Sequence, residues 1–290
     1  MLEQMKTQLQ RRINDYFHNE KSEFPEVERK RLLLLKRKAD LKKVKARAKI
    51  TNKINAGDQT KYYYICHLTF LLKQGEQFYL EEEVEKRVAT FDQESLLKDQ
   101  EIPTPIKQED LFFSRTDLDL QSVRIPYEYD RIKAVQYADR WWNDTNPKYK
   151  SFENNCTNFI SQCLHAGGAP MWGYPNRTKG WWYQGNNWSY SWSVAHALCL
   201  YLSSSTKGLR AEVVEDPRSL QLGDVIFYDF QGDGRFDHST IVTGKDAYGY
   251  PLVNAQTTNS RLRYWSYEDS SAYTNQIQYR FFSIVDHSKD

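Results

Sequence analysis

The stretch that decides the fold reads Asn154-Asn155-Cys156-Thr157-Asn158-Phe159-Ile160-Ser161-Gln162-Cys163-Leu164. Polar residues lead into apolar side chains at helical spacing, so a helix is predicted from Cys156 to His165, ended by Gly167-Gly168. A cysteine at the first helical position meets free backbone N–H groups and the helix dipole, which favour the thiolate. The same N–H groups suit a developing oxyanion. Taken alone, Cys156 is more typical of a small buried hydrophobic residue.

A histidine further along the chain favours the chemical interpretation. Asp224 to Tyr228 has the pattern of a strand, a Gly-Asp turn follows, and His238 begins a second strand. Histidine titrates near neutral pH, so it can take a thiol proton and return it to a leaving amine. The next strand carries Asn254, whose side-chain oxygen is suited to fix the tautomer of His238. The pattern predicts a Cys-His-Asn site of Cys156, His238 and Asn254.

The other histidines and cysteines of this half fit the chemistry poorly. His165 follows Cys156 on one helix at a rise of roughly 13 Å, too far for it to act as the base. Cys163 lies roughly 10 Å along the same helix, too far for a disulfide with Cys156. We expect Cys163 and Cys199 to be core residues and His196 to pack on a helix.

An aromatic loop separates the cysteine from the histidine. It carries five of the eight tryptophans, namely Trp172, Trp181, Trp182, Trp188 and Trp192. Such residues bury apolar area while keeping a polar atom available, so core packing and the lining of a substrate cleft both remain open. With Asn155, the residues expected at the oxyanion site or cleft are Trp181, Trp182 and Trp192.

A short acidic loop, Asp229 to Asp237, resembles a fragment of a calcium site. It lacks the distal bidentate glutamate and the full spacing of such loops. A turn that positions His238 is the competing interpretation. The proposed chemistry requires no metal and no cofactor.

The N-terminal half has a different pattern. Residues 1 to about 55 are rich in Lys, Arg, Glu and Leu, which predicts two helices, the second a basic one with Leu34, Leu41, Val44 and Ala48 along one stripe. Tyr62 to Leu72 then alternates with a period of two, a turn follows at Gln74 to Gln77, and Phe78 to Phe91 returns. This second part is typical of a β-hairpin.

Bulk properties narrow the class of protein. The 290 residues suit two domains, for which we predict bounds of 1–100 and 127–290 with a proline-containing linker at 101–126. The formal net charge of +2 gives no whole-protein attraction to nucleic acid, so no nucleic-acid partner is expected. We expect no transmembrane segment, since no apolar run approaches about 20 residues. Without a secretory signal the default location is cytoplasmic, where the four cysteines stay reduced.

Several motifs in one order resemble a known family. They are Cys156 to Leu164, Ala166-Gly167-Gly168, Trp181-Trp182, Ser191-Trp192, Leu222 to Ile226 and Asp237 to Val242. Together, over about Tyr127 to Asp286, they resemble the bacterial putative amidase domain, a relative of NlpC-type and CHAP cysteine peptidases, many of which act on cell-wall peptide. The resemblance implies a papain-like fold with Cys156 as nucleophile and His238 as base. Relatives vary at the third position, where Asn254 matches and Gln256 is the alternative, and commonly have Asp where this chain has Asn155.

The expected fold is therefore α+β, a papain-like domain whose cysteine-bearing helix packs on an antiparallel sheet, preceded by a smaller helix-plus-hairpin domain. The expected function is thiol-dependent hydrolysis of amide bonds, with peptidoglycan stem peptide as the substrate class that the resemblance favours. Two alternatives stay open. One is a catalytically idle module that binds peptide or wall, and the other is an adaptor acting through the basic N-terminal helix.

Overall fold

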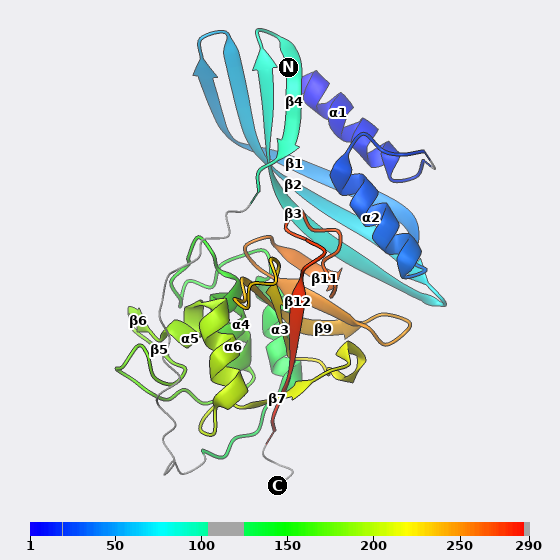
Figure 1. The fold of residues 1–290 in the computed structure, drawn as a ribbon. Helices are drawn as coiled ribbons and strands as arrows, with labels where there is room; N and C mark the ends of the chain where they lie inside the picture. The colour runs from blue at the N-terminus through cyan, green and yellow to red at the C-terminus, as the bar shows by residue number, and fades with distance from the viewer. Residues whose placement is uncertain (19, 104–124, 287–290) are drawn as a thin grey trace. The chain divides into compact units, whose positions relative to one another are not determined.

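The computed structural model describes residues 1–18, 20–103 and 125–286, and long antiparallel strands dominate the first of its two units (Figure 1). The first unit contains Met1–Pro105 and Thr258–Tyr273, and the second contains Ile106–Thr257 and Thr274–Asp290. The segment 258–273 thus belongs by its contacts to the N-terminal unit, although 127–290 was predicted as one domain. Most of the expected linker 101–126 lies outside the described residues.

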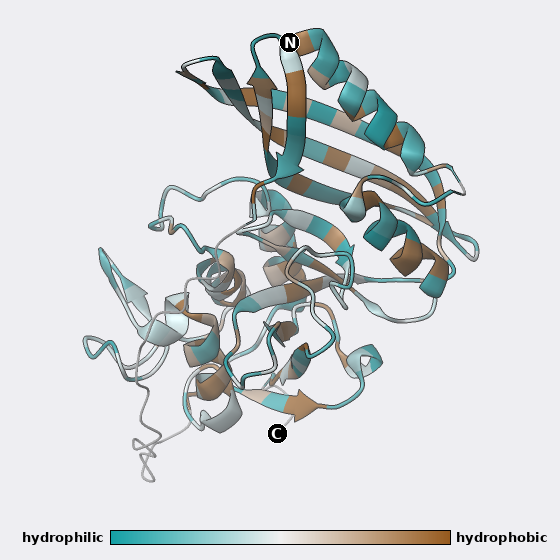
Figure 2. Ribbon diagram, turned by 45° about the horizontal axis from the view of Figure 1, so that its top comes forward, coloured by the Kyte–Doolittle hydropathy of each residue, from teal (hydrophilic) through white to brown (hydrophobic). Residues whose placement is uncertain are grey.

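The sheet of the first unit is antiparallel throughout. It is built from β1 (Asp40–Ala56), β2 (Gln59–Gln74), β3 (Gln77–Asp92), β4 (Ser95–Glu101) and β11 (Ser260–Tyr264). β3 pairs with β2 along its whole length and also with β4 and β11. Alternate residues of β2 are buried, and Figure 2 shows hydrophobic and hydrophilic residues interspersed along the long strands. The predicted hairpin is therefore confirmed.

Two helices, α1 (Leu2–Asp15) and α2 (Pro25–Lys36), cover one face of this sheet (Figure 1). α2 begins at Pro25, whose fixed φ and missing N–H suit the first helical position. Val27 and Leu34 of α2 are buried, and the ring of Tyr16 meets Phe70 of β2 edge-on with centroids 5.3 Å apart. Apolar burial between helices and sheet therefore holds this unit together.

The predicted basic helix is wrong beyond residue 36, because residues 40–56 form the strand β1. β1 pairs with β2 from Asp40 opposite Lys73 to Ala56 opposite Gln59. Of its residues only Val44 is buried, so most of its Lys and Arg side chains reach solvent. Lys and Arg favour helices intrinsically, but pairing with a long neighbour outweighs that preference, and charge on an outer strand discourages pairing with other chains.

The second unit contains five antiparallel strands, ordered β10-β9-β8-β12-β7. Its strands are β7 (Ala211–Val214), β8 (Val225–Asp229), β9 (His238–Lys245), β10 (Pro251–Ala255) and β12 (Gln278–Ile284). Its helices are α3 (Arg131–Trp141), α4 (Cys156–Ala166), α5 (Tyr190–Ser193) and α6 (Ala195–Ser204), with the short 3₁₀ turn η1 (Pro217–Ser219). β5 (Tyr183–Gln184) and β6 (Asn187–Trp188) form a small separate hairpin.

Helices α3 and α4 pack on β9 and β10, which brings the start of α4 beside the sheet. The helix predicted from Cys156 to His165 is present and ends one residue later, at Ala166, and the three predicted strands around His238 and Asn254 are confirmed. The mixed α+β class is confirmed, while the papain-like fold remains a prediction. In the described residues, no helix combines the length and the apolar character that crossing a bilayer requires.

Candidate active site

Cys156 is the first residue of α4, as predicted, and its N–H is one of the groups that a helix leaves without an internal partner. Asn155, at the N-cap, makes no side-chain capping bond. The hydroxyl of Thr257 serves instead, accepting from Asn155 N at 2.8 Å and from Cys156 N at 3.0 Å. Thr257 is the second residue after the end of β10, and no sequence pattern indicates this role.

The side chain of Asn155 fixes the loop that leads into α4. Its Oδ1 accepts from Phe152 N at 3.0 Å and from Asn158 Nδ2 at 2.9 Å. Its Nδ2 donates to Gln256 Oε1, and Gln256 in turn donates to the carbonyl oxygens of Trp141 and Asp144. The backbone before Cys156 is therefore held from three sides, which suits preorganised amide donors.

A pair of buried hydroxyls connects the cysteine helix to the histidine strand. Thr157, which follows Cys156, places Oγ1 3.1 Å from Oγ of Ser239, which follows His238. The Cys156 sulfur lies 3.7 Å from the same Thr157 Oγ1. Thr157 and Ser239 are fully buried, so this bond is shielded from water. It joins α4 and β9 at the two positions next to the proposed nucleophile and base.

His238 is the first residue of β9, opposite Tyr228 of β8. Its ring centroid lies 5.7 Å from that of Tyr228 and 6.3 Å from that of Phe230. The rings of His238 and Phe230 are stacked. Cys156 and His238 retain 5% and 8% of their accessible surface. The sulfur and the imidazole thus both lie just beneath the surface.

The loop before His238 is organised by Asp229. Its Oδ1 accepts from Gly232 N at 2.7 Å and its Oδ2 accepts from Gly234 N at 2.7 Å. Because backbone donors engage both carboxylate oxygens, the geometry favours the turn interpretation of residues 229–237 over the calcium one. Asp237 accepts from Phe230 N at 3.3 Å, and burial, with the nearby Asp229 and Asp233, raises the pKa of Asp237 to about 6.

Asn254 lies on β10 opposite Ile241 of β9. Residues directly opposite share a face and successive residues alternate, so Asn254 shares the face of Ile241 and Ser239. Its Oδ1 accepts from Thr243 Oγ1 at 2.8 Å, and its Nδ2 donates to Asp139 at 3.1 Å. An orienting role for Asn254 toward His238 stays a prediction.

The three tryptophans expected at a cleft lie in the core of the second unit. Trp181, Trp182 and Trp192 are at most 1% exposed. Their indole N–H groups donate inside the protein, that of Trp181 to Ser161 Oγ at 3.0 Å and that of Trp192 to Asn158 Oδ1 at 2.8 Å. Of the two interpretations of the aromatic loop, burial therefore favours core packing for these residues.

Other aromatic rings of this region remain partly exposed beside the nucleophile loop. The ring of Phe152 meets Trp188 at 4.9 Å, and Trp188 stacks with Tyr183 at 6.2 Å. Lys150 places its ammonium 4.9 Å from the Trp188 ring centroid. We call Phe152, Tyr183 and Trp188 the aromatic cluster. Since the backbone N–H of Phe152 donates to Asn155, the cluster directly adjoins the loop that carries Cys156.

The remaining thiols are fully buried. Burial raises the pKa of the Cys66 and Cys199 thiols to about 12, and burial also raises the pKa of the Cys163 thiol well above its usual value. A raised thiol pKa leaves little thiolate at neutral pH, so these residues suit packing. Burial lowers the pKa of His196, and its Nδ1 accepts from the backbone N–H of Phe236 at 3.3 Å.

Comparison with known proteins agrees with the sequence motifs. The family model for the putative amidase domain matches residues 128–282, more than half of the chain and the part that holds Cys156 and His238. The chain belongs to the putative amidase domain family. The uncharacterized protein YhbB of Bacillus subtilis is 50% identical over 267 residues, which cover 90% of this chain and 86% of YhbB. The uncharacterized protein YjcM of the same organism is 32% identical over 126 residues, 40% of this chain and 28% of YjcM. No solved structure matches.

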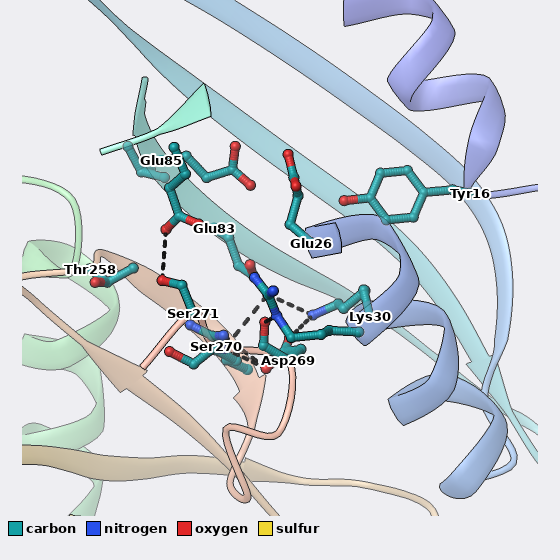
Figure 3. A pocket seen from close by; sticks show the side chains of 13 residues that line it. Tyr16, Glu26, Lys30, Glu83, Glu85, Thr258, Asp269, Ser270 and Ser271 are labelled. Atoms are coloured by element: carbon teal, nitrogen blue, oxygen red, sulfur yellow. Dashed lines mark hydrogen bonds and ion pairs between the residues drawn. The ribbon is translucent and has the colours of Figure 1, made fainter. Parts of the chain in front are cut away.

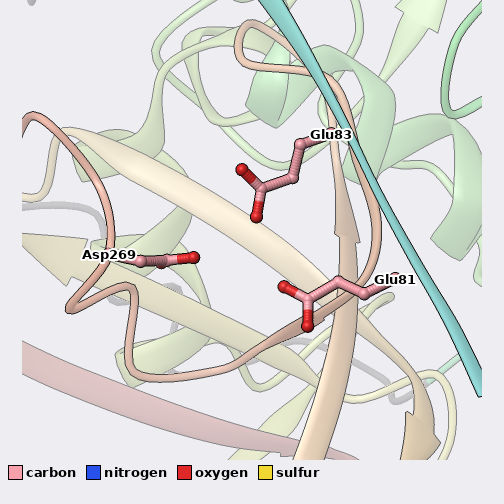
Figure 4. Close-up of side chains that lie close together, drawn as sticks. All are labelled: Glu81, Glu83 and Asp269. Atoms are coloured by element: carbon pink, nitrogen blue, oxygen red, sulfur yellow. The ribbon is translucent and has the colours of Figure 1, made fainter. Parts of the chain in front are cut away.

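This putative amidase domain protein also has a buried charge cluster in its N-terminal unit. A cavity of about 20 Å³ is lined by Lys30, Glu83 and Asp269 among others (Figure 3). The carboxylates of Glu81, Glu83 and Asp269 converge as metal ligands do (Figure 4). Lys30 already places its ammonium at this point, 2.6 Å from Glu83 and 2.8 Å from Asp269, and also contacts Glu81.

Two further cations belong to this cluster: Arg263 donates to Asp269 at 2.8 Å, and Arg37 pairs with Glu81 at 3.4 Å. Burial alone disfavours the Asp269 carboxylate, but the charges of Arg263 and Lys30 outweigh it and hold the pKa of Asp269 well below its usual range. Burial raises the pKa of Glu83 to about 7. Since cations of the protein itself already balance these carboxylates, we interpret the cluster as structural.

Proposed function

We propose that this protein is a thiol-dependent amidase in which Cys156 is the nucleophile and His238 is the general base. Family membership supports amide hydrolysis in general. The observation that carries the thiol mechanism is the bond between Thr157 and Ser239, because it ties the residue after Cys156 to the residue after His238. Cys156 also lies at the start of a helix and retains 5% of its accessible surface, whereas the other three cysteines retain none.

The proposed reaction has two halves. His238 takes the thiol proton of Cys156, the sulfur bonds to the carbonyl carbon of the amide, and the carbonyl π electrons move onto oxygen. Backbone amides at the start of α4 stabilise that oxyanion. The C–N bond then breaks while His238 gives its proton to the leaving amine. Water next attacks the thioester with His238 as base, which releases the acid and restores the thiol.

The third position of the site is proposed as Asn254, with Gln256 as the alternative. Asn254 is supported by its place on the strand beside β9, although it shares the face of Ser239 and its Oδ1 accepts from Thr243. Gln256 is supported by its bond to Asn155, the residue before Cys156. Replacing the residue that orients His238 by alanine should lower kcat with little change in KM, since the orientation of His238 matters mainly in the transition state.

The substrate class that we propose is the stem peptide of peptidoglycan, the class that the resemblance of the sequence motifs favours. The partly exposed aromatic cluster next to the nucleophile loop offers apolar area and polar atoms for a peptide. A catalytically idle binding module is the competing proposal, since it would use the same surface without thiol chemistry. The adaptor proposal is less well supported, because the second part of its expected basic helix, residues 40–56, forms β1.

A digestion assay with two matched variants tests the proposal. Purified peptidoglycan is incubated with wild type, Cys156→Ala and Cys163→Ala, and mass spectrometry identifies released peptides and newly formed termini. Both substitutions lie on α4, but only Cys156 is proposed to react. We expect wild type and Cys163→Ala to cleave the same amide bond and Cys156→Ala to release nothing above background. Equal cleavage by Cys156→Ala would exclude the thiol mechanism.

A further inference from the structure

Thr257 places one oxygen atom against two neighbouring backbone amides at the start of α4. Its Oγ1 lies 2.8 Å from Asn155 N and 3.0 Å from Cys156 N. An oxyanion hole needs donors at about 2.7–3.1 Å from the oxygen that becomes charged. One of the two donors is the amide of Cys156 itself. The Thr257 hydroxyl therefore stands where an oxyanion beside the Cys156 sulfur would be bound.

The backbone of Thr257 is strained. Its φ is +85°, in the left-handed region that favours glycine, and a β-branched residue rarely adopts it. Such conformations persist only where surrounding contacts enforce them. The hydrogen bonds that Thr257 Oγ1 accepts from the two backbone N–H groups are contacts of this kind. The preceding residue, Gln256, is also held in place, by hydrogen bonds to Asn155 and to two backbone carbonyl groups. The strained conformation therefore marks Thr257 as a residue that its surroundings hold in place.

We propose that Thr257 gates the oxyanion hole: in the resting protein its hydroxyl occupies the place that the carbonyl oxygen of the substrate takes during attack. This inference rests on the proposed role of Cys156 as nucleophile. As the C–S bond forms and negative charge develops on the carbonyl oxygen, that oxygen takes over both amide donors and the Thr257 side chain turns away. Charge-assisted bonds are stronger than neutral ones, so the exchange favours the transition state over the resting contact.

A plain capping role for Thr257 predicts the opposite effect of mutation. If the hydroxyl only stabilises the start of α4, removing it disorders the amides and weakens every ligand that depends on them. If the hydroxyl competes with the ligand oxygen, removing it strengthens the binding of that oxygen. Thr257→Val removes the oxygen and keeps the β-branched shape, whereas Thr257→Ser keeps the oxygen. Thr257→Ala is a second variant without the hydroxyl, and it replaces Thr257→Val in the measurement if the valine variant does not fold.

A peptide aldehyde, N-acetyl-alaninal, is a suitable probe because its oxygen enters the hole only after reaction. The Cys156 sulfur adds to the aldehyde carbon, the π electrons move onto oxygen, and this oxygen takes the thiol proton, giving a hemithioacetal. The full-length protein is treated with iodoacetamide at increasing aldehyde concentration, and alkylation of Cys156 is followed by peptide mapping. Each variant is compared with its own rate without aldehyde, and N-acetyl-alaninol, which cannot add to the thiol, serves as the control.

We expect Thr257→Val to lower the half-protecting aldehyde concentration about tenfold relative to wild type, the scale of losing a competing pair of hydrogen bonds. Thr257→Ser should stay within about twofold of wild type, and the alcohol should not protect. An unchanged or higher half-protecting concentration in Thr257→Val, or no protection in any variant, overturns the gate while leaving the nucleophile in place. Failure of wild-type Cys156 to react with iodoacetamide overturns the proposed function and the gate together.

Discussion

Asn155 shows how one neutral side chain adjusts the chemistry of its neighbour. The amide donates to Gln256 Oε1 and accepts from two other groups, so both of its ends are used. An aspartate at this position would accept but not donate, and it would face the Gln256 oxygen with a negative charge. The structure thus gives a reason for asparagine where relatives commonly have aspartate.

Asn155→Asp is therefore expected to destabilise the protein by about 1–3 kcal/mol, the range for leaving a buried polar group unsatisfied. The added charge beside Cys156 should also move the midpoint of its alkylation to higher pH, since a nearby negative charge disfavours the thiolate. Urea unfolding and the pH profile of iodoacetamide labelling measure the two effects. A midpoint that stays in place or falls would contradict this view of the loop.

Asp237 gives a pH-dependent prediction at the same scale. Its pKa in the folded protein is raised to about 6, above the unfolded value, so the folded state binds more protons between these values. Stability from this group is present at low pH and is lost as pH rises through about 6. Asp237→Asn keeps an acceptor for Phe230 N without the charge.

We expect Asp237→Asn to be more stable than wild type at about pH 7.5 and to show little difference at about pH 4, where the wild-type carboxyl is protonated. Thermal unfolding of both proteins at the two pH values measures the difference. Asp233→Asn is the control on the same loop. A larger gain in stability of Asp237→Asn at the lower pH would contradict this prediction, because it would mean that the charged Asp237 carboxylate stabilises the folded protein.

Elements differ in how much of them could be predicted from the sequence. Helix α4 follows directly from the helical spacing after Asn155 and from Gly167. The hydrogen bond between Thr157 and Ser239 could not be predicted, because the sequence around a serine or threonine does not indicate which distant group its hydroxyl contacts. β1 was misinterpreted for the same kind of reason, since its structure depends on pairing with β2 and not on local propensity.

The bond between α4 and β9 can be tested by a double-mutant cycle. Thr157→Val and Ser239→Ala should each cost about 1–3 kcal/mol, because each leaves a buried hydroxyl without its partner. The double variant should cost less than the sum, since it removes both hydroxyls. Denaturant unfolding gives these values. Strict additivity would show that the two side chains do not interact in solution.

At the scale of the whole molecule, residues from distant parts of the chain form one charge cluster. Lys30 of α2 meets Glu81 and Glu83 of β3, and Asp269 comes from the segment 258–273. The hairpin and the fold class were predictable from periodicity. The assignment of residues 258–273 to the N-terminal unit could not be predicted, because the charged residues of this segment are equally typical of an ordinary solvated loop.

Lys30→Met is expected to destabilise the protein by about 3–5 kcal/mol, because it leaves buried carboxylates without their main partner. Lys36→Met is the matched control, since Lys36 lies on the same helix and pairs with Glu268 of the same segment but is largely exposed. That exposed pair should contribute about 0–1 kcal/mol. Chemical denaturation of the full chain distinguishes them. Equal effects would mean that burial of the Lys30 pair adds nothing.

The most direct test of the proposed mechanism is the selectivity of iodoacetamide for Cys156 in the folded protein near pH 7. We expect Cys156 to be modified first, while Cys66, Cys163 and Cys199, whose thiol pKa values are raised by burial, react only after unfolding. His238→Gln should slow the modification of Cys156 by at least about tenfold, and His196→Gln should leave it unchanged. Modification of Cys156 no faster than the buried thiols, or at the same rate without His238, would contradict a Cys156–His238 site.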